Sequence, residues 1–125
     1  MKYKFFEELP CWLAARDVCK SIYLLIQQNR FKHDFSLRDQ MWRASGSIMD
    51  NIAEGFDDGS TREFVRFLGY SQRSCGEVQS QLCRAYDCNY ITQEQFDKTY
   101  NSLSECRKQV KGFRKYLREY AARNS

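Results

Sequence analysis

The side chains that most often carry enzyme chemistry are sparse in this sequence of 125 residues. Asp50 and Glu54 stand four residues apart on a predicted helix, and Asp57 and Asp58 follow in a loop. Paired carboxylates can hold a metal ion or share a proton. This loop, however, is too short for a calcium-binding EF-hand, and Asp-Asp-Gly-Ser is ordinary composition for a turn followed by a helix cap. We therefore expect these carboxylates to have neither a metal-binding nor a catalytic role.

His33 is the only histidine of the chain and lies in the polar stretch 29–34. A catalytic histidine needs an orienting third group, and only Asp34 is close to it in sequence. One histidine also cannot supply the two Glu-x-x-His pairs of a di-iron bundle. Gly55 and Gly59 do not form a phosphate-cradling loop, because Gly-Lys-Ser/Thr does not follow them. We expect a protein that is not an enzyme and has no cofactor, metal or small-molecule substrate.

The six cysteines show no pair with the C-x2-C spacing of a zinc site. Several fall on apolar helical stripes, where a cysteine behaves as a small hydrophobic side chain. The segment from Met1 to Leu9 lacks the apolar core of a signal peptide, and no run of about 18 apolar residues could span a membrane. We expect a cytoplasmic protein with no membrane partner, whose thiols are reduced and mostly buried. The cysteines are Cys11, Cys19, Cys75, Cys83, Cys88 and Cys106.

Positive charge is concentrated near the C-terminal end. Residues 1–97 contain 12 Lys and Arg against 14 Asp and Glu, whereas residues 98–125 contain 8 against 2. At about 100° per helical residue, several of these cations form one narrow stripe. Such a stripe can bind a phosphate backbone by releasing counterions, or it can be a solvated face that stabilises the helix dipole. No groove-reading motif accompanies it, so sequence-tolerant binding is the most that we expect. The stripe consists of Arg107, Lys111, Arg114 and Arg118, with Lys108 and Lys115 alongside.

Four helices are predicted to position these side chains. One proline and six glycines leave few breakers, and apolar residues recur at spacings of three and four in four segments. Short connections between these segments force neighbouring helices to be antiparallel. The sequence predicts one all-α domain over residues 1–125, an antiparallel up-down-up-down four-helix bundle. The predicted helices are about 10–30, 36–55, 60–88 and 92–122.

Each predicted helix has one apolar stripe that we expect to be buried. The stripes are Trp12, Ala15, Cys19, Ile22 and Ile26; then Leu37, Met41, Ala44, Ile48 and Ile52; then Phe64, Leu68, Ser71, Cys75, Val78, Leu82 and Ala85; and finally Phe96, Tyr100, Leu103, Cys106, Val110, Phe113, Leu117 and Tyr120.

Local signals set the predicted helix ends. Pro10 suits a first helical position, because its missing N–H would be unpaired there. Ser36 is the predicted N-cap of the second helix, and Gly55 is its predicted left-handed C-terminal stop. Two capping boxes are expected at the third and fourth helices. They are formed by Ser60 with Glu63 and by Thr92 with Gln95.

The chain carries more large apolar side chains than one stripe per helix requires. Some of them can thicken the core and close the ends of the bundle. A second apolar face on a small bundle also often marks an interface, so we expect self-association. These side chains are Leu13, Tyr23, Leu24, Leu25, Phe67, Tyr70 and Tyr86, with Phe5, Phe6, Phe31, Phe35 and Phe56 at the ends.

Several segments, in order along the chain, resemble the four-helix-bundle proteins encoded in intervening sequences of bacterial 23S rRNA genes. This family includes the accessory variability determinant of diversity-generating retroelements. The similarity spans most of residues 5–91, and the fourth helix matches only in pattern. The segments are Phe6-Glu7-Glu8-Leu9 with Trp12 and Ala15-Arg16; Gln40, Arg43-Ala44, Ser47-Ile48 and Asn51-Ile52-Ala53-Glu54-Gly55-Phe56; and Glu63-Phe64, Arg66-Phe67-Leu68, Glu77, Gln81-Leu82, Ala85, Asp87 and Tyr90-Ile91.

The resemblance implies a bacterial or phage cytoplasmic protein that forms a barrel-like homopentamer. For the retroelement branch it also implies binding to a reverse transcriptase and to nucleic acid through a basic surface. We therefore expect a non-enzymatic oligomer that binds RNA, DNA or a nucleic-acid enzyme such as a reverse transcriptase through the basic stripe. The alternative is a structural or protein-interaction module without affinity for nucleic acid.

A cluster of polar residues is also expected on the second helix. Asn51 and Glu54 lie one turn apart and share a helix face. Together with Arg43, or with an arginine of another helix, they could form a buried hydrogen-bonded network. Because half-satisfied buried polar groups are costly, such a network would fix the register of the helices.

Overall fold

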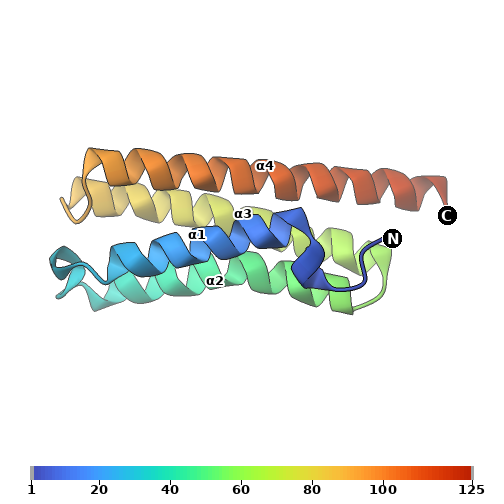
Figure 1. Cartoon of the computed structure of the whole chain (residues 1–125), viewed down its shortest axis with the longest axis horizontal. Helices are drawn as coiled ribbons and strands as arrows, with labels where there is room; N and C mark the ends of the chain where they lie inside the picture. Colours follow the sequence, from blue (N-terminus) through green and yellow to red (C-terminus); the bar gives the residue numbers. More distant parts are fainter. Residues whose placement is uncertain (1, 125) are drawn as a thin grey trace.

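The computed structural model describes residues 2–124 and contains four long helices joined by short connections. The helices are α1 (Pro10–Ile26), α2 (Phe35–Asp57), α3 (Thr61–Asp87) and α4 (Gln93–Arg123). Two short 3-10 helices, η1 (Phe6–Glu8) and η2 (Asn29–Phe31), precede α1 and α2. Successive long helices run in opposite directions, so α1 begins and α4 ends at the same end of the molecule (Figure 1). The predicted all-α up-down-up-down bundle is confirmed.

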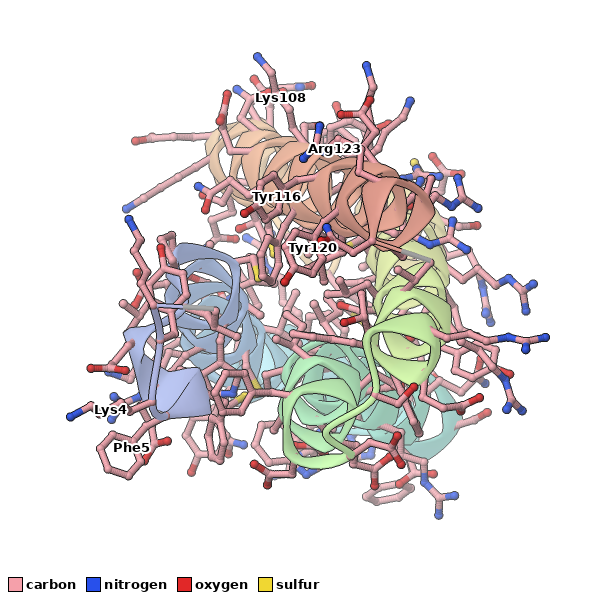
Figure 2. All side chains as sticks on the ribbon, turned by 90° about the vertical axis from the view of Figure 1, so that its right-hand side faces the viewer. Lys4, Phe5, Lys108, Tyr116, Tyr120 and Arg123 are labelled. Atoms are coloured by element: carbon pink, nitrogen blue, oxygen red, sulfur yellow. The ribbon has the colours of Figure 1, made fainter. Side chains whose placement is uncertain are left out.

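The bundle is four-sided when it is viewed along its axis (Figure 2). Each long helix packs against its neighbours in the chain, and α1 also packs against α4, which closes the bundle. The face formed by α1 and α2 therefore lies on the opposite side of the bundle from the face formed by α3 and α4.

The core consists largely of the predicted stripes. Every predicted stripe residue of α2 and of α3 is buried. Cys19 of α1 and three aromatic residues of α4 are only half-buried, and Tyr120 is 41% exposed. Tyr120 lies in the last turns of α4, and this end of α4 extends past the neighbouring helices (Figure 1). The half-buried aromatic residues are Phe96, Tyr100 and Phe113.

The connection between α1 and α2 differs from the prediction. Helix α1 ends at Ile26 rather than near residue 30, and η2 follows it. This turn places Phe31 fully inside the bundle, with its ring centroid 4.9 Å from that of Tyr90. The chain leaves the helix early because burying this ring stabilises the fold more than about one further turn of exposed helix would.

The N-cap of α2 is Asp34 rather than the predicted Ser36. The Asp34 Oδ1 atom accepts a hydrogen bond of 3.1 Å from the backbone N–H of Leu37. Its Oδ2 atom accepts one of 2.9 Å from the Tyr90 hydroxyl, which raises the pKa of Tyr90. Asp34 therefore caps the helix and also joins the α1–α2 connection to the segment between α3 and α4.

The caps of the last two helices follow the sequence more closely. Thr92 and Gln95 form the predicted capping box of α4. Ser60 caps α3 by accepting a 3.3 Å hydrogen bond from the Glu63 N–H, but the Glu63 carboxylate pairs with Arg66 instead of completing a box. One half of that prediction is therefore confirmed.

Gly55 does not end α2, as the sequence suggested, because the helix continues to Asp57. The left-handed residue is instead Gly59, whose φ is +82°. Gly55 is buried where α2 packs against α3. A Cβ atom on it would lie 2.7 Å from Phe64 Cδ1 and 2.8 Å from Phe67 Cβ. Its role is to allow close helix packing rather than to allow a turn.

We expect Gly55→Ala to destabilise the protein by about 1–3 kcal/mol, because the added methyl group forces two phenylalanine side chains to move. Gly112→Ala is the matched control. Gly112 is also inside a helix, but nothing lies within 4 Å of its Cβ position. Alanine there should stabilise the fold by about 0.5–1 kcal/mol through the entropy of the unfolded chain. Urea unfolding measures both changes, and equal effects of the two substitutions would contradict this role of Gly55.

The six cysteines are free thiols in environments that differ widely. Cys11, Cys75 and Cys106 are buried, whereas Cys83 and Cys88 are exposed and Cys19 is intermediate. Burial raises the pKa of Cys11 to about 12. The expectation of mostly buried thiols therefore holds for the core positions and not for the two exposed cysteines at the end of α3.

Thiol reactivity should separate these groups. Because the thiolate is the reactive form, we expect Cys83 and Cys88 to react rapidly with a disulfide reagent at pH 8 in the folded protein. Cys11, which is buried and has a raised pKa, should react only after unfolding. Quantitative titration with and without denaturant measures this difference. Fewer than six thiols in denaturant, or immediate reaction of all six in the folded protein, would contradict it.

Candidate nucleic-acid interface

Two arginines of the predicted basic stripe lie against α3. The Arg114 Nε atom donates a hydrogen bond of 2.9 Å to the backbone carbonyl of Val65. Two helical turns earlier, the Arg107 guanidinium donates a hydrogen bond of 3.4 Å to Gln79 Oε1. Both guanidinium groups are therefore held at the α3–α4 boundary instead of extending freely into water.

Two glycines of α3 make room for these arginines. A Cβ atom on Gly69 would lie 2.8 Å from Nη2 of Arg114, and one on Gly76 would lie 3.2 Å from Nη1 of Arg107. The glycines are seven residues apart, and so are the arginines, because seven residues return a helix to nearly the same face. This matched spacing was present in the sequence, but it could not be interpreted before the pairing of α3 with α4 was known.

Helix α3 contributes three further arginines that the sequence analysis missed. Arg62, Arg66 and Arg73 line an open hollow with a volume of about 690 Å³. Arg114 of α4, Glu63 and Tyr70 line the same hollow. We call it the arginine hollow, and we call the hollow together with Arg107 and Arg118 the basic α3–α4 surface. The spacing of four and seven residues places these α3 arginines on one helix face. The sequence analysis missed them because residues 1–97 contain more acidic than basic residues, so that the net charge of this segment does not reveal a local group of arginines.

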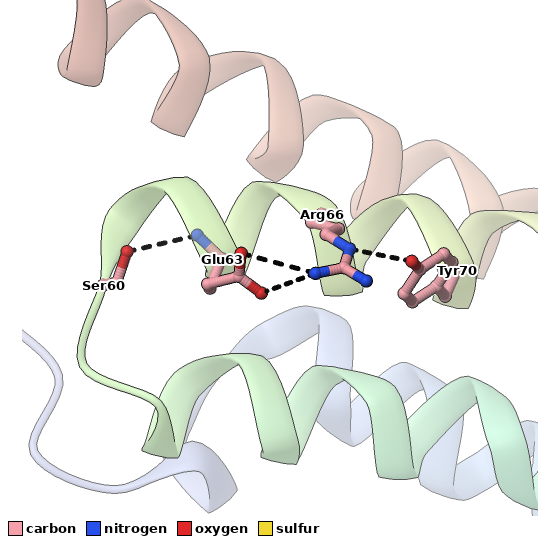
Figure 3. Close-up of polar contacts among 4 residues, drawn as sticks. All are labelled: Ser60, Glu63, Arg66 and Tyr70. Carbon is pink, nitrogen blue, oxygen red and sulfur yellow. Dashed lines mark hydrogen bonds and ion pairs between the residues drawn. The ribbon is translucent and has the colours of Figure 1, made fainter.

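One carboxylate, that of Glu63, lines the arginine hollow. It pairs with Arg66 at 3.1 Å, and the Arg66 Nε atom also donates a 2.8 Å hydrogen bond to the Tyr70 hydroxyl (Figure 3). Among residues 2–124, the ion pairs within 4.0 Å are this one and Arg43 with Asp39. The cations of the predicted stripe are therefore not neutralised by carboxylates in that part of the chain.

Arg114 experiences this uncompensated positive charge directly. Partial burial lowers the pKa of Arg114, and the positive charges of Arg118 and Arg73 lower it further. Like charges from two helices thus converge on one place. An anion bound there would offset the repulsion between the arginines and the desolvation of Arg114, because a nearby negative charge favours the charged form of each arginine.

The six predicted cations do not form one continuous surface. Lys108 projects from the outer side of α4, away from the other helices (Figure 2). Lys115 follows seven residues later and is also exposed, as is Lys111. The structure therefore brings Arg114 and Arg118 together with α3 arginines and places Lys108 on a different face.

The expected buried cluster of Arg43, Asn51 and Glu54 is not formed. The Arg43 side chain is 78% exposed and pairs with Asp39 at 3.0 Å, and Glu54 is exposed. The Asn51 amide donates hydrogen bonds of 2.8 and 2.9 Å to the carbonyl and hydroxyl oxygens of Ser47. All three residues line an open hollow on α2. A long charged side chain can keep its head group in water here, so the arginine and the glutamate have no reason to be buried.

Serines provide the buried polar contacts between α2 and α3 instead. The Ser71 hydroxyl donates a hydrogen bond of 2.8 Å to the Ile48 carbonyl. The hydroxyl groups of Ser74 and Ser47 are 3.1 Å apart and hydrogen-bonded. These hydroxyl groups therefore pair with polar groups of the facing helix inside the α2–α3 contact.

The features associated with catalysis or membranes give no further candidate site. Among residues 2–124, no three His, Cys, Asp or Glu side chains are grouped so that they could hold a metal ion. His33 is exposed in the connection before α2. Within the same residues, every helix is too short or too polar to cross a lipid bilayer.

An apolar face lies on the other side of the bundle, between α1 and α2. Tyr23 and Trp42 meet there edge to face with ring centroids 5.7 Å apart, and Leu24 is 69% exposed. Together with Cys19 and Met49 they line a hollow of about 460 Å³, and Arg16 and Lys20 also line it. We call this the apolar α1–α2 face. The sequence analysis named Tyr23 and Leu24 but missed Trp42, which lies beside the core stripe of α2.

Comparisons with known proteins agree with this architecture. The family model described as 23S rRNA-intervening sequence protein matches residues 7–112. A crystal structure of a protein with unknown function from the S23 ribosomal protein family of Bacteroides thetaiotaomicron is similar, with a TM-score of 0.78 and 24% sequence identity. That similarity covers 84% of this chain and 95% of the other, and it shows a shared fold. No curated protein matches the chain.

Proposed function

This chain belongs to the 23S rRNA-intervening sequence protein family, and on that premise we propose that it binds nucleic acid without sequence preference through the basic α3–α4 surface. The ligand is the phosphate backbone of RNA or DNA. No chemical step is involved, and the protein acts as a binding module.

The observation that carries this proposal is the convergence of arginines without carboxylate partners. Arg62, Arg66 and Arg73 of α3 line one hollow with Arg114 of α4, and the pKa of Arg114 is lowered by partial burial and then by the charges of Arg118 and Arg73. A solvated helix face normally spreads like charges apart or alternates them with acidic residues. A phosphate backbone supplies the missing negative charge and releases its counterions on binding.

The way in which the arginines are held also supports binding. Arg114 is fixed by the Val65 carbonyl and lies across Gly69, so little side-chain entropy remains to be lost when a phosphate binds. Arginine is also the side chain best suited to phosphate, because its planar guanidinium can donate two parallel hydrogen bonds.

The test is a salt titration of the binding of a labelled RNA and a labelled DNA. For the wild-type protein, log K should fall linearly with log salt concentration. Arg73→Gln, Arg107→Gln, Arg114→Gln and Arg118→Gln combined should make this slope shallower by up to about 3 and weaken binding.

A matched control removes the same charge elsewhere. It combines Lys4→Gln, Lys32→Gln, Arg38→Gln and Lys98→Gln, all outside the basic α3–α4 surface. Its slope should stay close to that of the wild type. Wild-type binding that is absent or insensitive to salt, or equal losses in both quadruple variants, would rule out this function.

We propose in addition that copies of the chain associate through the apolar α1–α2 face. Exposed large apolar side chains gathered around one hollow are unusual on a monomer, and Leu24, Tyr23 and Trp42 form such a group. Because this face lies opposite α3 and α4 (Figure 2), association through it leaves the basic α3–α4 surface open. Sedimentation at tens of micromolar should show an oligomer that Leu24→Glu dissociates. A monomeric wild-type protein would contradict this arrangement.

A further inference from the structure

We infer that the arginine hollow receives one nucleotide of a single strand, with its phosphate among the arginines and its base against Tyr70. This inference rests on the proposed function and specifies the kind of nucleic acid that the site recognises. It also gives Tyr70 a binding role that neither the basic stripe nor the family membership assigns to it.

The first step is the shape of the site. The hollow is an indentation of about 690 Å³ rather than a flat surface. In a duplex the bases are paired and stacked inside the helix, so that only its backbone could touch the rim. A single strand can turn a base out and place it in an indentation beside its phosphate.

The second step is the aromatic ring in the hollow. Tyr70 is half-buried, and its ring packs edge to face on Phe67 with centroids 6.0 Å apart and planes at 89°. The hydroxyl is held by the 2.8 Å hydrogen bond from Arg66. The ring is therefore fixed in orientation in the lining of the hollow.

The third step is the arrangement of guanidinium groups around that ring. The Cζ atoms of Arg66 and Arg73 each lie 5.6 Å from the ring centroid. Arg66 is engaged by Glu63 and by the Tyr70 hydroxyl, whereas Arg73 pairs with no carboxylate within 4.0 Å among residues 2–124. Aromatic and guanidinium planes both stack on bases, and a positive groove with such a platform is the usual design of single-strand binding sites.

The experiment compares a labelled 12-nucleotide DNA strand with the blunt duplex of the same sequence, in the same salt, by fluorescence anisotropy. Tyr70→Ala should weaken binding of the single strand about 5-fold or more, because one stacked base is lost, and should leave duplex binding unchanged. Tyr70→Phe should keep single-strand affinity, because it keeps the ring. Tyr116→Ala removes an exposed tyrosine outside the hollow and should change neither affinity.

A further variant protects the test against a loss of folding. Tyr70→Leu retains apolar packing on Phe67 but has no aromatic face. It should therefore lose single-strand affinity and keep duplex affinity, and it replaces Tyr70→Ala in the test if the alanine variant folds poorly. Salt-dependent binding of both ligands that no Tyr70 variant changes would overturn this inference and leave the proposed function standing. An equal loss for strand and duplex would also overturn it. Absence of salt-dependent binding to either ligand would instead remove the proposed function itself.

Discussion

Arg73→Glu combined with Arg118→Glu is expected to weaken binding of a 12-nucleotide single strand about 100-fold at 0.1 M salt. The two substitutions remove two phosphate contacts and place carboxylates beside Arg114, whose pKa is lowered by partial burial and by the charges of Arg118 and Arg73. The new carboxylates would neutralise Arg114 in place of the phosphate. Anisotropy titrations at fixed salt measure the loss.

Folding should survive this change, because Arg73 and Arg118 are both exposed. Removing two like charges next to Arg114 should leave the free energy of unfolding unchanged or slightly higher. Lys32→Glu with Lys98→Glu introduces the same change of net charge outside the basic α3–α4 surface and serves as the control. If the control loses as much affinity as the arginine variant, net charge alone explains binding and the surface has no special role.

Phe31→Ala is expected to lower the free energy of unfolding by about 3–5 kcal/mol. Phe31 lies in the short helix η2 between α1 and α2, yet its side chain is fully buried and packs on Tyr90. Removing the ring leaves a cavity at the end of the bundle that the short connections cannot collapse to fill. Urea unfolding at a fixed protein concentration measures the change.

Phe35→Ala is the matched control for this prediction. Phe35 lies four residues later, but its side chain is 70% exposed, so the expected change is within about 0.5 kcal/mol. Similar losses in the two variants would show that the connection does not close the core in the way described.

The sequence was sufficient to predict the helices because their apolar periodicity is strong. All buried apolar residues of α2 and α3 were predicted, because in each helix they recur at spacings of three and four along one face. The helix ends were harder to predict. Asp34 was overlooked as a cap because Ser36 offers a similar signal two residues later, and Gly55 looks like a stop only until Phe64 and Phe67 are placed against it.

The candidate site was predicted only in part, because it depends on two helices. The α4 cations could be placed on one helix face from spacing alone, and Arg107, Arg114 and Arg118 do lie on the basic α3–α4 surface. The α3 arginines join them only through the packing of α3 against α4, where Gly69 and Gly76 leave room for the side chains of Arg114 and Arg107. Periodicity within one helix contains no information about which faces of two helices meet. The expected cluster around Arg43 was wrong for a related reason, because sharing a helix face does not bury a side chain.

The most direct measurement is the position of the bound strand on the protein, observed through glycine amide resonances in selectively ¹⁵N-labelled protein. Gly69 and Gly76 lie beneath Arg114 and Arg107, whereas Gly46 lies in the hollow on α2. On addition of the 12-nucleotide strand, the amide signals of Gly69 and Gly76 should shift and saturate while that of Gly46 stays in place. Saturating shifts at Gly46 without any at Gly69 and Gly76 would show that nucleic acid binds elsewhere and would contradict the account.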